Sequence, residues 1–336
     1  MKKKILITGA NGFLGSAIVR SALKKKYIVN ALVRKKSELK NLDNILSKIN
    51  VFFGDIRNIE SIHEAILDSD IIFHVAADYR LWSRKPSDIY ASNVLGTENI
   101  AMKAIELNKF LIYTSSVATL SIQDNKISDE SDLGSFNEMI GDYKKSKYLA
   151  ELVIKNLIKK KKLKSIIVSP STPIGPGDIK PTPTGKIILD VLKKKMPAYV
   201  DTGLNFVHVD DVAEGHFLAL KYGKIGENYI LGGENLKFKE FIDLVAYYGD
   251  VSSTNIKVNP RYLKFLAVIN EFFAKYIFNY NPSLTIDSLK MSEKKMFFSS
   301  DKSKKKLHYR PRNIKNAIKD AVNWTKSNFL NNIINK

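Results

Sequence analysis

Short apolar runs alternate with segments of helical periodicity along the first half of the chain. A short apolar run bounded by turn residues is typical of a buried strand, and apolar residues that recur once per turn indicate a helix packed on one face. The pattern predicts strands at residues 4–8, 27–33, 51–54, 71–75, 110–115 and 165–169. It predicts helices between them at 14–25, 59–67, 86–107 and 142–160. This alternation predicts an α/β fold with a parallel sheet that helices cover on both faces.

The rhythm changes after residue 169. Five prolines and three glycines crowd residues 170–185, which argues against regular structure in that segment. Because the segment follows a central strand, we interpret it either as a lid over a ligand or as a plain linker. Helical patterns resume from Ile187, one more strand is predicted at 229–231, and the remainder is mainly helical, with a last helix at 314–329.

The composition excludes several kinds of site. The 336 residues are 44% hydrophobic, enough for a sizeable core, and include no cysteine. This excludes disulfides, thiolate zinc sites and cysteine nucleophiles, and it is typical of a reducing compartment such as the cytoplasm. The five histidines are scattered without the spacing of metal ligands, so no metal site is predicted.

The net charge of +20 arises mainly from lysine, because 46 of the 54 basic residues are Lys and eight are Arg. Nucleic-acid interfaces often use Arg for bidentate contacts, so we interpret the basic surface as solvated and predict no nucleic-acid partner. No apolar run is long enough for stable insertion in a membrane. Residues 263–278 form an amphipathic helical pattern, for which core or interface packing is the main interpretation and contact with a membrane surface the alternative.

Three glycines, Gly9, Gly12 and Gly15, directly follow the first predicted strand and open the first helix. Glycines in such a turn permit a tight bend, close backbone approach to a diphosphate and close packing of the helix on the sheet. The amino end of the helix adds amide donors for phosphate groups. The turn therefore predicts a dinucleotide site.

The residues after the second and third strands bear on which dinucleotide is bound. An acidic residue after the second strand would bind the ribose hydroxyls of NAD, but the chain has Arg34, Lys35 and Lys36 there. Cations suit a 2′-phosphate, so we predict NADP(H), with NAD(H) as the alternative. After the third strand, Asp55 either accepts a hydrogen bond from adenine, with Ile56 over the ring, or caps the next helix.

Small and hydroxylated residues end the next two strands. The Val-Ala-Ala run at 75–77 lets the backbone pass close to a ligand, and the Thr-Ser-Ser run at 114–116 lies at the carboxyl edge of the sheet, where open α/β folds bind ligands. A hydroxyl of the second run either holds a substrate oxygen or caps backbone groups. We expect both uses within the triplet.

Tyr143 and Lys147 form a Y-x-x-x-K spacing. On a helix, residues at this spacing share one face. A phenol has a reference pKa of about 10, and a cation one turn away favours the phenolate and lowers that pKa. We therefore expect the pair to exchange a proton with a carbonyl/alcohol couple.

Taken in this order, the features resemble the extended short-chain dehydrogenase/reductases, the family of NAD(P)-dependent epimerases, dehydratases and reductases. The motifs that match are T-G-A-x-G-F-x-G at 8–15, G-D at 54–55, N-V-x-G-T at 93–97, T-S-S at 114–116, Y-x-x-x-K at 143–147 and V-H-V-D-D-V-A at 207–213. Residues 74–82, 171–178 and 196–203 are most similar to the dihydroflavonol 4-reductase-like branch, and above all to its hopanoid-associated sugar epimerases.

The patterns and the resemblance together predict a Rossmann doubly wound parallel sheet with a smaller, mostly helical C-terminal substrate domain. The dinucleotide-binding domain is expected at 1–170, rejoined by 206–232, and the substrate-binding portion at 171–205 and 233–336. The resemblance implies a cytoplasmic enzyme with a small-molecule substrate. It also implies a homodimer formed through the helices predicted at 86–107 and 142–160.

The resemblance implies Ser116, Tyr143 and Lys147 as catalytic residues, with Asn93 either assisting the proton relay or holding the central helices. The positions expected to bind the cofactor are Gly9, Asn11, Gly12, Phe13, Leu14, Gly15, Arg34, Asp55, Ile56, Val75, Ala76, Ala77, Asn93, Thr114, Tyr143, Lys147, Pro170, Ser171 and Thr172. The positions expected to bind the substrate are Tyr79, Arg80, Trp82, Ser116, Lys186 and Tyr199.

Three hypotheses about function follow. The first is an NADPH-dependent carbonyl reductase of the dihydroflavonol 4-reductase-like type, with Tyr143 as general acid. The second is a nucleotide-sugar epimerase without net redox change, although Ser169 and Pro170 depart from the Arg-Pro or Asn-Pro pair of many sugar-nucleotide members. The third is a non-catalytic dinucleotide-binding scaffold.

Overall fold

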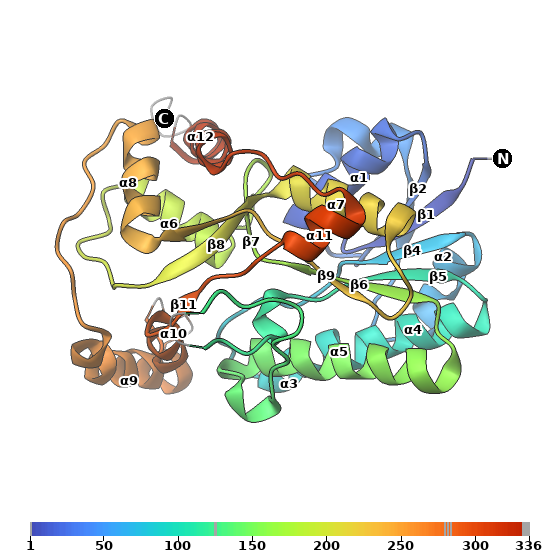
Figure 1. Ribbon diagram of the computed structural model, residues 1–336, viewed down its shortest axis with the longest axis horizontal. Helices are drawn as coiled ribbons and strands as arrows, with labels where there is room; N and C mark the ends of the chain where they lie inside the picture. Colours follow the sequence, from blue (N-terminus) through green and yellow to red (C-terminus); the bar gives the residue numbers. More distant parts are fainter. Residues whose placement is uncertain (1, 124–125, 279, 281, 283, 331–336) are drawn as a thin grey trace.

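The computed structural model describes residues 2–123, 126–278, 280, 282 and 284–330, and Figure 1 shows their arrangement. Parallel strands form a large sheet of seven in the order β3–β2–β1–β4–β5–β6–β9. Their bounds are β1 Lys4–Thr8, β2 Ile28–Val33, β3 Asn50–Phe53, β4 Ile71–His74, β5 Phe110–Thr114, β6 Ser165–Pro170 and β9 Asn228–Leu231. The predicted doubly wound parallel sheet is confirmed.

The strand order reverses between β1 and β4. The chain first runs outward from β1 through β2 to β3, and then returns to β4 and continues through β5 and β6 in the opposite direction. At such a reversal the connections on either side diverge, which opens a crevice at the carboxyl ends of the strands. The order of the strands therefore places a ligand site beside the ends of β1 and β4.

Helices cover both faces of this sheet (Figure 1). One face carries α1 (Phe13–Lys24), α7 (Val209–Tyr222) and α11 (Asp301–Leu307), and the other carries α2 (His63–Leu67), α4 (Gly96–Glu106) and α5 (Gly141–Lys161). The strand β1 shows the cause, because Ile5 and Ile7 enter the core with α1 and α7, whereas Leu6 enters the opposite core with α4 and α5. Successive strand residues face opposite sides, so a fully apolar strand buries both faces.

The helical segment predicted at 86–107 contains an irregular turn. It consists of α3 (Pro86–Tyr90), a π-helical turn at Ala91–Leu95, and α4. A π-helical turn inserts an extra residue into the helical ladder and occurs often at functional sites. This one carries Asn93, whose side chain is buried.

A small second sheet lies beside the large one. Its central strand β8 (Gly203–His208) pairs in parallel with β7 (Thr172–Ile174) and β11 (Lys295–Met296) and antiparallel with β10 (Glu234–Lys237). The sequence patterns missed all four strands, because β7 and β11 are very short and β10 alternates only partly. The small sheet therefore depends on pairing between distant segments.

The expectation that residues 170–185 lack regular structure was wrong. The segment includes β7 and the start of α6 (Pro183–Leu192). A proline is tolerated in the first turn of a helix, where its missing N–H has no helical partner. Thr182 caps α6 by accepting a hydrogen bond from the backbone N–H of Gly185.

Helices also surround the small sheet. The later helices are α8 (Phe238–Gly249), α9 (Pro260–Tyr276), α10 (Ile286–Ser292) and α12 (Ile314–Thr325). Side chains of α6, α8 and α12 form one core with β8, in which the rings of Phe206 and Phe241 stack with their centroids 4.0 Å apart. This core is separate from the two cores of the large sheet, so the C-terminal part has its own hydrophobic support.

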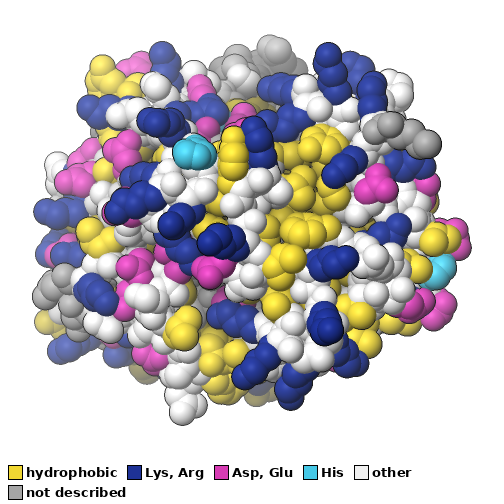
Figure 2. Space-filling view, turned by 45° about the vertical axis from the view of Figure 1, so that its right-hand side comes forward, with side chains coloured by type: hydrophobic (Ala, Val, Ile, Leu, Met, Phe, Trp, Pro, Cys, Tyr) yellow, Lys and Arg dark blue, Asp and Glu magenta, His cyan; other side chains and the backbone are white. Residues whose placement is uncertain are grey.

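Charged side chains are spread over the surface. Figure 2 shows Lys and Arg across the visible face, interspersed with Asp and Glu and not gathered into one stripe. In the part of the chain that the structure describes, no helix is long and apolar enough to cross a membrane.

Candidate active site

A cavity of about 1020 Å³ lies at the carboxyl ends of the large-sheet strands, where the crevice was expected. Its wall combines the turn after β1, the ends of β4, β5 and β6, the first turns of α5, and parts of β8, β11 and α10. Of the positions expected to bind the cofactor, all except Asn93 line this cavity. The fold therefore brings together residues from almost the whole chain.

The turn between β1 and α1 is packed too closely for side chains at two of its glycines. Gly9 has a φ of +65°, and a Cβ there would lie 2.9 Å from the Cα of Ala76. A Cβ on Gly15 would lie 2.1 Å from the carbonyl oxygen of Gly9. The helix α1 starts after Gly12 with no side-chain cap and no acidic residue in its first turn. Its first amide groups are thus left for an anion, and the turn fits the diphosphate of a dinucleotide.

A second cavity of about 580 Å³ adjoins the first at the ends of β2 and β3. Arg34, Lys35 and Lys36, the cations on which the prediction of NADP(H) rests, line this cavity. Glu38, which no sequence pattern indicated, also lines the larger cavity, and its backbone carbonyl accepts a hydrogen bond from the side chain of Asn11 at 3.0 Å. Besides these three cations, the carboxylates of Asp55 and Glu38 therefore lie near this end of the crevice.

The carboxylate of Asp55 is held by Arg57. The backbone N–H of Arg57 lies 3.0 Å from Oδ1 of Asp55, and the guanidinium Nη2 lies 2.6 Å from Oδ2. These hydrogen bonds lower the pKa of Asp55. The carboxylate closes a turn at residues 55–57 and does not cap α2, which begins at His63, so the capping alternative was wrong. Ile56 packs against Gly96: a Cβ placed on Gly96 would lie 2.6 Å from the Cδ1 of Ile56.

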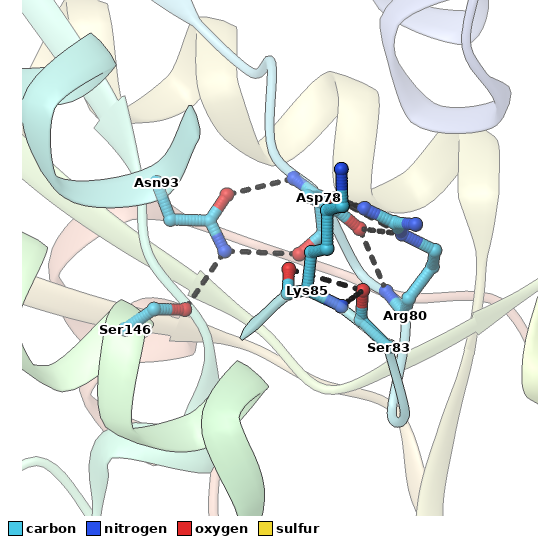
Figure 3. Close-up of polar contacts among 6 residues, drawn as sticks. All are labelled: Asp78, Arg80, Ser83, Lys85, Asn93 and Ser146. Atoms are coloured by element: carbon cyan, nitrogen blue, oxygen red, sulfur yellow. Dashed lines mark hydrogen bonds and ion pairs between the residues drawn. The ribbon is translucent and has the colours of Figure 1, made fainter. Parts of the chain in front are cut away.

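Asn93 ties the loop after β4 to α5 (Figure 3). Its side-chain oxygen accepts from the backbone N–H of Asp78 at 2.7 Å, and its amide nitrogen donates to the Asp78 carbonyl and to Ser146 Oγ, both at 2.9 Å. Both donors and the acceptor of the amide are thus used inside the protein. Of the two roles that the resemblance implied for Asn93, the structure supports the one of holding neighbouring segments.

The three hydroxyl residues at the end of β5 have different partners. The Oγ1 of Thr114 is hydrogen-bonded to a buried histidine of α7, and Ser115 donates to a buried glutamate of α5. Ser116 Oγ accepts the backbone N–H of Ala118 at 3.1 Å, and its interaction with the Tyr143 side chain lowers the pKa of that phenol. The structure therefore pairs Ser116, and neither of its neighbours, with the tyrosine hydroxyl.

Tyr143 and Lys147 both line the cavity from α5. The Nζ of Lys147 donates to the carbonyl of Thr114 at 2.7 Å and to the hydroxyl of Tyr113 at 3.1 Å. Burial lowers the pKa of Lys147 to about 8. Burial also raises the pKa of Tyr143, although the hydrogen bond with Ser116 opposes this shift. The expected lowering of the Tyr143 pKa was wrong, because loss of water outweighs that hydrogen bond and the Lys147 donors point to β5.

The cavity beyond Tyr143 is largely apolar. Its wall there includes Ile122, Ile187, Leu204, Met291, Met296 and Phe298. These residues come from six different segments, five of them in the C-terminal half of the chain. Sequence patterns could not identify them, because each belongs to an ordinary apolar stretch and only the fold brings them together.

Lys144 is a buried cation in this apolar part of the wall. Its side chain is 7% exposed, and its Nζ donates to the sulfur of Met296 at 3.7 Å. Burial, together with repulsion from Lys294, lowers its pKa to about 8. A thioether is a weak acceptor, so this ammonium is poorly compensated. Lys144 could not be identified from the sequence, since no local signal distinguishes it from the other lysines.

The expected substrate positions divide into two groups. Tyr79, Arg80 and Ser116 line the cavity, with Arg80 in an ion pair with Asp78 at 2.5 Å. Of the residues that the structure describes, Trp82, Lys186 and Tyr199 are not part of the cavity wall. Helix α6 directs Ile187 to the cavity and leaves Lys186 exposed, and Tyr199 packs against the core of the small sheet. The assignment of those three to the cleft was wrong.

The segment Pro170, Ser171 and Thr172 passes along the cavity where β6 leads into β7. The Oγ of Ser171 is buried and has no hydrogen-bond partner among the described residues. An unpaired buried hydroxyl is costly, so this atom fits a polar group of a bound ligand. The observation supports a dinucleotide that extends from the glycine turn to this segment.

Asp178 is a further titratable group of the cavity wall. It is buried, and its carboxylate accepts from the backbone N–H of Thr182 at 2.9 Å and from its hydroxyl at 2.8 Å. Burial raises its pKa to about 6.

In the described part of the chain, no group of three or more His, Asp or Glu side chains could hold a metal ion.

Comparisons with known proteins agree with this geometry. Residues 5–232 match the NAD dependent epimerase/dehydratase family. Over 326 residues the chain is 39% identical to the Synechocystis protein named "Putative dihydroflavonol 4-reductase", covering 95% of this chain and 93% of that one. It is 27% identical to sterol demethylase protein B of Methylococcus capsulatus, covering 95% and 97%. The crystal structure of gox2253 is similar with a TM-score of 0.87 and 44% identity, covering 98% and 99%.

Proposed function

The chain belongs to the NAD dependent epimerase/dehydratase family, and from that membership we propose that it is an NADP(H)-dependent reductase acting on the carbonyl group of a small, largely apolar molecule. The observation that carries the proposal is that Ser116 and Tyr143 line the same cavity, with Lys147 one helical turn from Tyr143 on α5. A hydroxyl pair beside a buried cation is what protonation of a carbonyl oxygen needs.

Each of these side chains has a separate task in the proposed reaction. The bound dinucleotide supplies the hydride. Tyr143 donates its proton to the substrate oxygen, which Ser116 holds by a hydrogen bond. Once Tyr143 has lost its proton, the positive charge of Lys147 stabilises the phenolate. The carbonyl of Thr114 and the hydroxyl of Tyr113 hold the Lys147 ammonium in place for this task.

Tyr143 would enter the two candidate reactions in the same protonation state. Because burial raises its pKa, the phenol keeps its proton at neutral pH and is ready to act as an acid. An epimerase of the hydride-transfer type must first oxidise its substrate, and that step needs the tyrosine as a base. Because the same tyrosine would act first as base and then as acid in an epimerase, its protonation state is compatible with both reactions.

The wall of the crevice supports the choice of cofactor and substrate. Arg34, Lys35 and Lys36 offer positive charge to a 2′-phosphate, which favours NADP(H) over NAD(H). The apolar wall beyond Tyr143 favours an apolar substrate. A dihydroflavonol is a suitable first probe, since the Synechocystis relative is named for that reaction. The homodimer and the cytoplasmic location implied by the resemblance stay predictions.

The proposal is tested by following nicotinamide absorbance with purified protein, NADPH or NADH, and a dihydroflavonol or a simple aromatic aldehyde. We expect NADPH to be consumed in proportion to the alcohol formed, and more efficiently than NADH. A protein that retains its dinucleotide through purification and interconverts sugar isomers without change in absorbance would instead be an epimerase. Binding of the dinucleotide with neither activity would favour the non-catalytic scaffold.

A further inference from the structure

The helix α9 exposes an apolar stripe to the outside. Six large side chains recur along it at helical spacing, and their exposed fractions are 81% for Tyr262, 73% for Phe265, 54% for Leu266, 37% for Ile269, 53% for Phe272 and 65% for Tyr276. The residues of α9 that are buried are Ala267 and Ala274. In Figure 1 the helix forms a corner of the molecule, next to α10. Of the expected uses, core packing is therefore wrong for this stripe, and interface packing stays a prediction.

Polar contacts on its inner side hold α9 in this orientation. The side chain of Asn270 donates to the carbonyl of Leu284 at 2.9 Å, and Glu271 accepts the backbone N–H of Ile286 at the same distance. From the other side, the guanidinium of Arg84 donates to the carbonyl of Ala274 at 2.6 Å. The polar face of the helix is thus bound to the protein, and the apolar face is held outward.

The exposed charges of α9 are all positive. Arg261, Lys264 and Lys275 are exposed, whereas Glu271 is half-buried in its contact with α10. Lys264 also lies 3.5 Å from Glu293, an ion pair whose two side chains are both exposed. The helix therefore combines an apolar stripe containing aromatic residues with flanking cations, and the chain as a whole carries a charge of +20.

We propose that α9 is a membrane-docking helix that lies flat on a lipid bilayer containing anionic lipids. An amphipathic helix with aromatic and aliphatic residues on one face and cations beside them is suited to the headgroup boundary of such a surface. A second copy of this chain is a poorer occupant, because two surfaces with the same positive charges repel each other. Docking brings the substrate cavity close to the lipid, since Ser288, Met291 and Ser292 of α10 line that cavity.

Co-sedimentation with lipid vesicles tests this docking and requires no turnover. Wild-type protein is mixed with vesicles of phosphatidylcholine alone or of phosphatidylcholine and phosphatidylglycerol in equal amounts. We expect binding to the anionic vesicles, weakening as salt is added, and at least about a tenfold loss of affinity in the double variant Phe265→Glu, Phe272→Glu, because two large apolar side chains no longer enter the lipid. Tyr247→Glu on α8, where the side chain is 77% exposed, is the matched control and should bind like wild type.

Three results would overturn the proposal. They are no binding of wild type to anionic vesicles, equal binding by the double variant, and a wild-type dimer in sedimentation equilibrium that the double variant abolishes while vesicle binding is absent. The last result would assign the face to a second copy of the chain. Circular dichroism of the double variant and its cofactor binding show whether it is folded. If the protein binds vesicles but lacks reductase activity, the docking proposal stands and only the proposed function is contradicted.

Discussion

The ammonium nitrogen of Lys147 lies 3.1 Å from the hydroxyl oxygen of Tyr113 and 4.7 Å from the centre of its ring. The two side chains meet across the boundary between α5 and β5, in the buried layer beneath the cavity wall. Burial raises the pKa of Tyr113 well above that of a free tyrosine, so its hydroxyl stays neutral and serves as a fixed acceptor. The lysine is thus positioned by β5, one helical turn from Tyr143 on the same helix.

Replacement of Tyr143 by phenylalanine should remove turnover and keep cofactor binding. The variant loses the hydroxyl that donates the proton, so kcat should fall by about two orders of magnitude or more, as expected for loss of a general acid. The dissociation constant for NADPH, measured by fluorescence titration, should change little. Tyr148→Phe is the control, because Tyr148 lies on the same helix with its ring against Phe136. Equal turnover in the two variants would contradict the role assigned to Tyr143.

Replacement of Arg34 by alanine should change the preference for the dinucleotide. A hydrogen bond to a charged group contributes about 1.5–3 kcal/mol, so the dissociation constant for NADP⁺ should rise by roughly tenfold or more. Binding of NAD⁺ to the same variant is the internal control and should change much less, since NAD⁺ lacks the 2′-phosphate. Isothermal titration with both dinucleotides measures the difference. Parallel weakening of both would show that Arg34 does not contact a 2′-phosphate.

Replacement of Lys144 by methionine should stabilise the protein below pH 8. The folded-state pKa of Lys144 is about 8, below the unfolded value of about 10.4. Between these values the unfolded chain binds more protons, so the lysine destabilises the folded state fully at pH 7 and progressively less as pH rises towards its unfolded pKa. Methionine has a similar length and no charge, and the gain at pH 7 should be about 3 kcal/mol or less.

Urea unfolding of wild type and of Lys144→Met at several pH values checks this dependence. The difference between their free energies of unfolding should be largest at pH 7. It should shrink as the pH rises towards the pKa of an unperturbed lysine. Lys145→Met is the control, because that side chain lies over the ring of Phe136 at the surface of the same helix turn. A pH-independent difference for Lys144→Met would show that packing, and not the buried charge, determines its stability.

Replacement of Gly15 by alanine should destabilise the protein. The new Cβ would meet the carbonyl oxygen of Gly9 at 2.1 Å, and this backbone atom cannot move without opening the turn. Overpacking of this kind costs about 1–3 kcal/mol. At Gly12 the nearest atom to a new Cβ is 3.2 Å away, so Gly12→Ala should cost less. Thermal unfolding of the two variants compares them, and a Gly12→Ala variant as unstable as Gly15→Ala would refute the steric argument.

The large sheet and the dinucleotide turn could be predicted because their signals are local. Residues 4–8 form β1 as expected, and the helix predicted at 142–160 is Gly141–Lys161 in the structure. Both follow from apolar periodicity within one segment. The glycine turn follows from residues that are neighbours in sequence. The small sheet could not be predicted in this way, since β8 has partners from three distant parts of the chain.

The sequence by itself determined the succession of strands along the large sheet, the glycine turn, and the spacing of Tyr143 and Lys147, because periodicity and turn chemistry act between near neighbours. Only the tertiary structure decided that Ser116 and neither of its neighbours meets Tyr143, that Lys144 is buried against Met296, and that the apolar stripe of α9 faces outward. These outcomes depend on which segments, distant in sequence, pack together and bury each other's side chains. The residue pattern within one segment does not indicate which other segment it will contact.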